Sequence, residues 1–484
     1  MVYGLAMTSP SASAATAHPA AATLGQLRSS GWVSVPVKDE IRRNAVGRIA
    51  AGQALFPGVL GYEDTVLPQL ENAILAGHDV IFLGERGQAK TRMIRSMTEL
   101  LDEWLPIVAG SEILDDPYNP VSKHAKDLIA EHGDDVAIEW VHRSKRYGEK
   151  LATPDTSIAD LIGEVDPIKV AEGRYLSDEL TLHYGLVPRT NRGIFAINEL
   201  PDLSERIQVG LLNVLEERDV QIRGYKIQLP LDIVLVASAN PEDYTNRGRI
   251  ITPLKDRFGA QIRTHYPLET SIELKVVEQE AMKPAGGDIA ITVPAFMAEI
   301  VATFSHLARQ SPHVNQRSGV SVRLTVANYE TLIAAALRRA LRGGETEAVP
   351  RVSDLDSLMA STQGKIEIET LDEREGSVVD KLFKASTLTV FKEACRIEDL
   401  RGVIQAFEAG LVMHAGDDQT AADYATALNS AEGEPLREAV RKLVGAKATP
   451  GEQASAVEFI LEGLHLSKRL NKDAAGNKAT YRGR

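Results

Sequence analysis

The chain has 484 residues, of which 44% are hydrophobic and 25% charged, and its formal net charge is −13. This composition is typical of a soluble globular protein with about two to four domains, and the acidic balance argues against broad adhesion to nucleic acid or anionic membrane. The one cysteine, Cys395, excludes an internal disulfide, and no apolar run approaches the ~20 residues of a membrane span, so we expect a cytoplasmic protein.

The N-terminal segment, residues 1–36, is rich in Ala, Ser, Thr and Pro and lacks the charged and apolar blocks of a signal peptide. This composition predicts disorder. Ordered structure is expected from residue 37, with helices over residues 38–54 and 63–75. An apolar run over residues 80–83 predicts a buried strand, and apolar residues then keep helical spacing from Met93 to Trp104.

A glycine-bearing turn follows that strand and ends in Lys-Thr, in the spacing G-x-x-x-x-A-K-T. A strand that enters such a turn aims backbone N–H groups at a polyphosphate, and the following helix adds its positive end. Lys90 would reach the β- and γ-phosphates and Thr91 would ligate Mg²⁺. Ala89 stands where the motif has its second glycine and adds a Cβ where backbone freedom is useful. The predicted nucleotide-binding residues are Gly84, Glu85, Arg86, Gly87, Gln88, Ala89, Lys90 and Thr91.

The middle of the chain alternates polar stretches with apolar runs. Residues 110–153 read as polar and irregular, and their basic run HRSKRYGEK could touch nucleic acid, although a solvated loop or short helix is favoured in an acidic chain. A capped helical turn is expected over residues 157–168. Further on, the pattern predicts a strand at 193–197, a helix at 203–215, a hairpin at 220–229 and a strand at 231–237, which together indicate a parallel sheet covered on both faces.

The C-terminal half is almost wholly helical in pattern. Residues 269–342 are predicted to form a helical domain in which Ser321 caps one helix. A Gly- and acid-rich stretch, 343–376, predicts a linker, and a second helical region is expected over residues 377–470. The last residues, 471–484, are basic and polar and are predicted to fray.

Polar residues at the ends of the later strands match the needs of nucleotide chemistry. Asn198 and Glu199 follow the strand at 193–197: the amide oxygen of Asn198 can accept a hydrogen bond from a metal-bound water, and Glu199 can activate the attacking water. Asn198 brings no negative charge, so it should hold Mg²⁺ less firmly than an aspartate. Asn240 ends the next strand and could help to place that water.

Two arginines complete the set. Arg257, in LKDRFG, could neutralise charge on a transferred phosphoryl group across a subunit boundary. Arg323 lies in the first turn of the helix capped by Ser321, where a cation opposes the helix dipole unless a bound phosphate favours it.

The order GERGQAKT, GIFAINE, VASANPEDY, LKDRFG and SVRL resembles an AAA+ ATPase, most closely the branch that holds the magnesium chelatase ATPase subunit and the MoxR proteins. The likeness covers roughly residues 41–342. Two insertions support that branch: the approach TSIADLIGEVDPIKVAEGRYLSDELTLHYGLVPRTNRG and the hairpin ERDVQIRGYKIQLP. The resemblance implies an α/β P-loop core over residues 37–268, with inserts near 110–153 and 157–192, followed by a helical lid at 269–342 and an extra helical C-terminal region.

The resemblance also implies roles for the matching residues. Gly84 to Thr91 would form Walker A, Asn198 and Glu199 Walker B, Asn240 sensor 1 and Arg323 sensor 2, with Arg257 as an arginine finger that acts between subunits of a ring, usually a hexamer. Ala89 and Asn198 depart from the family pattern, which bears on turnover more than on nucleotide binding.

Three functions follow from this resemblance. The favoured one is a motor that binds and hydrolyses ATP with Mg²⁺ and acts as a chaperone-like remodeller or metal-insertion helper, with a von Willebrand factor A domain protein as its partner. The alternatives are a true magnesium chelatase subunit and a nucleotide-gated scaffold with little hydrolysis. A DNA-linked transcription activator is disfavoured, because the sequence has no GAFTGA-like loop and no helix-turn-helix tail.

Overall fold

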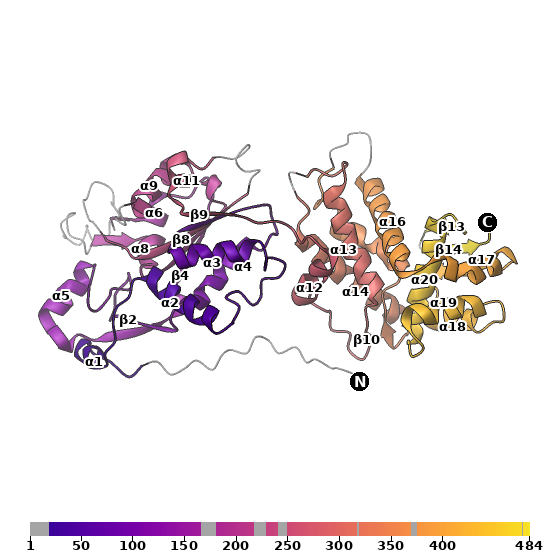
Figure 1. The fold of residues 1–484 in the computed structure, drawn as a ribbon, viewed down its shortest axis with the longest axis horizontal. Coiled ribbons are helices and arrows are strands. Elements are labelled where there is room, and N and C mark those ends of the chain that lie inside the picture. The colour runs from indigo at the N-terminus through magenta and orange to yellow at the C-terminus, as the bar shows by residue number, and fades with distance from the viewer. Residues whose placement is uncertain are drawn as a thin grey trace. The chain divides into compact units, whose positions relative to one another are not determined.

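The fold is seen in a computed structural model that describes residues 19–165, 181–216, 229–240, 249–316, 319–368, 375–476 and 478–484 (Figure 1). The chain divides into two compact units. The first comprises Met1–Gly84 and Ala89–Thr264, and the second comprises Glu85–Gln88 and His265–Arg484.

The first unit is built on a five-stranded sheet in the order β4-β7-β8-β1-β9. All its neighbouring strands run parallel. The strands are β4 (Tyr147–Leu151), β7 (Gly193–Asn198), β8 (Ile233–Ala239), β1 (Val80–Leu83) and β9 (Ala260–Arg263). The three central strands, β7, β8 and β1, are near-continuous apolar runs, as expected for strands buried on both faces.

Helices cover both faces of this sheet, which confirms the predicted α/β class (Figure 1). One face packs against α2 (Val37–Ala50), α3 (Val66–Ala76) and α4 (Lys90–Ser96). The other packs against α6 (Ile158–Leu161), α8 (Leu186–Arg189), α9 (Glu205–Glu216) and α11 (Thr252–Arg257). Along β7, Ile194 and Ala196 join the first layer, whereas Phe195 and Ile197 join the second, because successive side chains alternate across a strand.

Three predictions for the N-terminal half were wrong. Residues 19–36 are not wholly disordered, because α1 (Leu24–Ser29) buries Leu24 and Leu27, and Leu24 packs against residues from later in the chain. Residues 1–18 lie outside the described part. The helix expected to reach Trp104 ends with the 3₁₀ turn η1 (Met97–Leu100), and Trp104 instead begins β2 (Trp104–Val108).

The third error concerns residues 110–153, which are not an irregular loop. They carry α5 (Lys123–His132), the short turns η2 (Gly133–Asp135) and η3 (Arg143–Lys145), β3 (Ile138–His142), which pairs antiparallel with β2, and the sheet strand β4. The basic run HRSKRYGEK was expected to be solvated, yet Arg146 at its centre is fully buried in an ion pair with Glu40. A run of charged residues predicts a solvated segment, because the sequence alone does not show a buried partner that lies 106 residues away.

The insert that follows β4 agrees with the predicted pattern at its start. Ser157 and Asp160 form the capping box of α6, as predicted. The insert continues through β5 (Gly163–Val165), which pairs antiparallel with β6 (Leu182–Tyr184). The predicted hairpin at 220–229 falls almost wholly outside the described residues.

The second unit is largely helical around one extended hydrophobic core. Its helices are α12 (Thr270–Glu280), α13 (Ala295–Gln310), α14 (Val322–Gly343), α15 (Met359–Thr362), α16 (Glu375–Ala394), α17 (Arg401–Glu408), α18 (Ala421–Leu428), α19 (Glu434–Val444) and α20 (Pro450–Leu466), with the 3₁₀ turns η6 (Val352–Leu358) and η7 (Ile397–Leu400). Ser321 caps α14 as predicted, because its side chain accepts a hydrogen bond from the N–H of Arg323.

The core of the second unit corrects two predicted boundaries. The expected linker, 343–376, contains β11 (Glu347–Ala348), which pairs with β10 (Ala290–Ile291), and η6, whose Leu355 and Leu358 belong to the core. Lid and C-terminal helices therefore share one core instead of flanking a linker.

The C-terminal tail was expected to fray, but it forms β13 (Asn471–Ala475) and β14 (Lys478–Arg482), which make a three-stranded antiparallel sheet with β12 (Met413–Gly416). Tyr481 is 2% exposed and donates a hydrogen bond to Glu462. Three basic residues of the tail pair with acids: Lys472 with Glu462, Lys478 with Asp418 and Arg482 with Asp473. Their charge therefore does not favour disorder.

No helix within the described ranges combines the length and apolar character needed to cross a membrane.

Candidate functional site

The turn after β1 contains two residues with a left-handed backbone. Gly87 has φ +77°, and Ala89 has φ +54° and immediately precedes α4. The left-handed region costs an L-residue about 1–2 kcal/mol, so Ala89 carries a strain that the glycine of the usual motif would not. The turn therefore does require backbone freedom at position 89, as the sequence predicts.

Hydrogen bonds fix both ends of this turn. The N–H of Gly84 donates to the carbonyl of Ala239 at 3.1 Å, which ties the turn to the end of β8. The N–H of Glu85 donates to the Gln88 side chain at 3.0 Å. The Lys90 ammonium donates to the carbonyl of Gly84, so it folds back across the loop that would receive phosphates.

The polar ends of β7 and β8 lie beside that turn. Because β1, β8 and β7 are adjacent and parallel, their carboxyl ends share one edge of the sheet, where α/β proteins bind ligands. Gly84, Asn240 and Glu199 follow these three strands directly. The structure thus brings the predicted loop, base and water-placing residue to one edge.

Ser238, which the sequence argument did not single out, joins the two strand ends. Its hydroxyl donates to Oδ1 of Asn198 at 3.2 Å and accepts the N–H of Glu199 at 3.3 Å. Glu199 has φ +56°, an uncommon backbone for a non-glycine residue that clusters at functional sites. In the sequence, the only sign of this role for Ser238 is its place two residues before Asn240.

A second residue that the sequence argument missed is Glu149 on β4. The amide nitrogen of Asn198 donates to Oε1 of Glu149 at 2.5 Å. Arg95 of α4 donates to the same carboxylate through Nε at 2.9 Å and Nη2 at 3.2 Å, and the Tyr147 hydroxyl donates at 2.9 Å. Glu149 could not be found from sequence because its segment read as a loop.

These contacts keep Glu149 ionised. Partial burial disfavours the charge, but the hydrogen bonds from Arg95 and Tyr147, the arginine's positive charge and the Asn198 amide outweigh it, so the pKa of Glu149 lies below its usual value. A carboxylate charge therefore stands next to the asparagine that lacks one.

The two predicted arginines belong to different units. Arg257 is the last residue of α11 and is exposed. Arg323 is exposed in the first turn of α14, in the second unit. Their roles as finger and sensor stay predictions.

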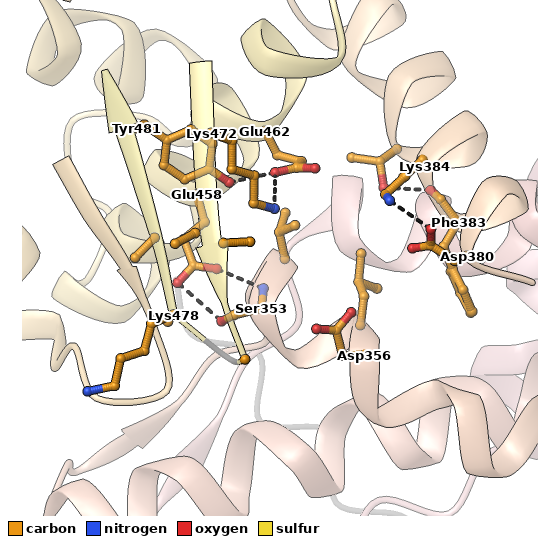
Figure 2. A pocket seen from close by; sticks show the side chains of 18 residues that line it. Ser353, Asp356, Asp380, Phe383, Lys384, Glu458, Glu462, Lys472, Lys478 and Tyr481 are labelled. Atoms are coloured by element: carbon orange, nitrogen blue, oxygen red, sulfur yellow. Dashed lines mark hydrogen bonds and ion pairs between the residues drawn. The ribbon is translucent and has the colours of Figure 1, made fainter. Parts of the chain in front are cut away.

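The second unit contains a separate cavity of about 230 Å³ between η6, α16, α20 and the C-terminal sheet. Figure 2 shows the Asp380–Lys384 pair on one side of it and Glu462, Lys472 and Tyr481 on the other. Burial, together with the charges of Asp380 and Glu462, raises the pKa of Asp356 in its wall against the opposing effect of Lys472. In the described part of the chain, no group of three or more His, Cys, Asp or Glu side chains could hold a metal ion.

Comparison with known proteins agrees with the motifs. A model of the Sigma-54 interaction domain matches residues 171–257. The chain is 28% identical over 248 residues to the magnesium-chelatase subunit ChlI of Nostoc sp., covering 48% of this chain and 60% of that one. It is 29% identical over 243 residues to the ChlI subunit of Nephroselmis olivacea, covering 47% and 61%. The chain thus matches about three fifths of the length of these relatives.

A solved structure described as the complex between subunits BchI and BchD of magnesium chelatase is 21% identical, with 68% of this chain and 98% of that chain covered and a TM-score of 0.34. The order of the motifs and the ChlI relatives both show that the chain is similar to AAA+ ATPases, in the branch of the magnesium chelatase ATPase subunit and the MoxR proteins.

Proposed function

We propose that this protein is a motor that binds ATP with Mg²⁺ and hydrolyses it. The observation that carries the proposal is the shared edge of β1, β8 and β7, where the Gly84–Thr91 turn, Asn240 and Glu199 come together. Lys90 would pair with the phosphates, Glu199 would take a proton from the attacking water, and Asn240 would orient that water. The αL backbone of Glu199, held by Ser238, supports a fixed direction for this carboxylate.

The residues at this edge suit Mg²⁺. The Thr91 hydroxyl and the Asn198 amide offer oxygen donors, which Mg²⁺ prefers. The amide orientation is set chemically, because its NH₂ must face the acceptor-only carboxylate of Glu149. Oδ1 accepts the Ser238 hydroxyl with one lone pair, and its second lone pair could accept a hydrogen bond from a metal-bound water. Mg²⁺ that arrives with the nucleotide would neutralise phosphate charge.

Nucleotide binding is tested with Lys90→Ala, which removes the charge facing the phosphates and should abolish binding of a fluorescent ATP analogue. Lys126→Ala, on an exposed position of α5, is the matched control. Unchanged affinity in Lys90→Ala would contradict the loop assignment. Hydrolysis is tested by steady-state phosphate release, which should vanish in Glu199→Gln. If wild-type protein binds but releases no phosphate, the scaffold with little hydrolysis is the correct function.

We further propose that the active species is a ring, usually a hexamer in this family, in the cytoplasm. Exposure of Arg257 supports a role between subunits. Arg257→Ala should bind ATP but hydrolyse little, and mixing it with Glu199→Gln should restore some activity, because one subunit then contributes the intact finger and its neighbour the intact base. Absence of restoration under assembling conditions counts against this arrangement. In the same proposal, the partner is a protein with a von Willebrand factor A domain, and the motor acts as a chaperone-like remodeller or as a metal-insertion helper.

The second candidate is a true magnesium chelatase subunit, which the ChlI relatives favour. Adding presumptive partner subunits, porphyrin and Mg²⁺ should then produce metal insertion. Hydrolysis without insertion would leave the remodelling motor as the better function.

A further inference from the structure

Asn198 and Glu149 form a chemically matched pair across two strands. In the β4–β7 register Glu149 pairs with Ala196, so Glu149 lies on the same sheet face as Ala196 and Asn198. Their side chains meet at 2.5 Å. A carboxylate only accepts hydrogen bonds, so the group opposite it must be a donor. An aspartate at position 198 would set two carboxylates against each other.

Glu149 also lies beside the residues that would hold the nucleotide. Its partner Arg95 stands four residues after Thr91 on α4, so the two share one side of that helix. That helix packs on the β7 face that carries Ile194 and Ala196. The Glu149 side chain is 20% exposed, whereas Arg95 is 64% exposed, so the carboxylate is the more enclosed member of the pair.

We propose that Glu149 supplies, from the neighbouring strand, the negative charge at the metal side of the nucleotide site that Asn198 lacks. Asn198 then acts as the donor that positions this carboxylate. This inference rests on the proposed function, because it concerns how the same site favours Mg²⁺. The negative charge that the family pattern has at position 198 is then present one strand away, on Glu149 of β4.

The test measures how much Mg²⁺ the full chain needs to bind a labelled, non-hydrolysable ATP analogue. Glu149→Gln should raise the Mg²⁺ concentration for half-maximal binding about tenfold, because one nearby negative charge is lost, while binding in EDTA is not weakened. Asn198→Asp alone should not lower that concentration, because it creates a repulsive carboxylate pair. The double variant Glu149→Gln/Asn198→Asp should return it to within about threefold of wild type, since it reverses the donor and acceptor.

Two controls separate this role from a structural ion pair. Glu99→Gln removes an exposed carboxylate that pairs with Arg143 and should leave the Mg²⁺ requirement unchanged. Arg95→Met changes an exposed side chain and uncovers the Glu149 charge, so it should lower the requirement about threefold. If the Arg95–Glu149 pair has only a structural role, Arg95→Met and Glu149→Gln should both lose thermal stability. The Mg²⁺ requirement should then not fall in the first variant and rise in the second.

The outcomes are distinguishable. If Glu149→Gln binds with the wild-type Mg²⁺ requirement, or if the double variant stays as poor as Glu149→Gln, the inference is overturned and the proposed function stands. If Glu149→Gln does not fold, Arg95→Met and the double variant decide in the same way. If wild-type protein ignores the analogue with and without Mg²⁺, the proposed function itself fails.

Discussion

Replacing Arg146 by methionine should destabilise the first unit more than any comparable change at its surface. The Arg146 and Glu40 side chains are 0% and 3% exposed, and their two hydrogen bonds are both 2.7 Å long. Arg146 also donates to the carbonyl of Arg192 at 2.9 and 2.6 Å. Methionine fills similar space but leaves the Glu40 carboxylate buried without its cation.

The magnitude follows from that burial. Removing one partner of a buried ion pair costs about 3–5 kcal/mol, which corresponds to a fall in Tm of roughly 6–20 °C for a unit of this size. An exposed pair contributes about 1 kcal/mol or less. Arg143→Met, three residues earlier and paired with Glu99 at a more exposed position, is therefore the matched control. Glu40→Leu/Arg146→Met should recover part of the loss, because neither charge is then left alone.

Tryptophan fluorescence during urea or thermal unfolding is the appropriate assay. The three tryptophans of the chain, Trp32, Trp104 and Trp140, all belong to the first unit, so the signal reports this unit alone. If Arg146→Met costs no more than Arg143→Met, or if the double variant is less stable than Arg146→Met, the reasoning from burial is refuted.

Four further predictions follow from individual sites. Ala89→Gly should relieve the left-handed backbone and stabilise the first unit by about 0.5–1 kcal/mol in urea unfolding; a loss of stability would contradict it. Gly463→Ala should destabilise the second unit by about 1–3 kcal/mol or more, because its Cβ would lie 2.0 Å from the buried Phe391 ring. Unfolding followed by circular dichroism measures this loss. Gly344→Ala is the control for backbone strain alone, because a Cβ there meets nothing within 4 Å but φ is +64°. Burial, with a contribution from Asp399, raises the pKa of Cys395 to about 11, so maleimide labelling at pH 7.5 should be roughly tenfold or more slower than for a free thiol and should accelerate on unfolding. The pKa of Glu149 is lowered in the fold, so its carboxylate contributes stability that is present above the unfolded pKa of about 4.3 and is lost as the pH falls through the folded value. The difference in unfolding free energy between wild type and Glu149→Gln should therefore be constant from pH 6 to 8 and shrink toward zero in acid. A difference that grows toward low pH would contradict this.

Local pattern in the sequence was enough to predict the elements that approach the nucleotide. The apolar runs of β1, β7 and β8, the Gly84–Thr91 turn that leads from β1 into α4, and the Ser321 cap each depend on residues that are neighbours in the chain. The buried parallel strands are marked by continuous apolar runs, and the cap by a hydroxyl before the first turn. These signals, together with the order of the motifs, also predicted the likeness to AAA+ ATPases.

The tertiary structure alone decided what stands beside those elements. The Asn198–Glu149 contact spans 49 residues and the Arg146–Glu40 pair spans 106. The polar strand β4 looked like a loop because its charged residues are satisfied by distant partners instead of by water. The basic tail looked frayed for the same reason. Which charge meets which depends on strand order and register, and a sequence specifies these only through the packing of the whole sheet.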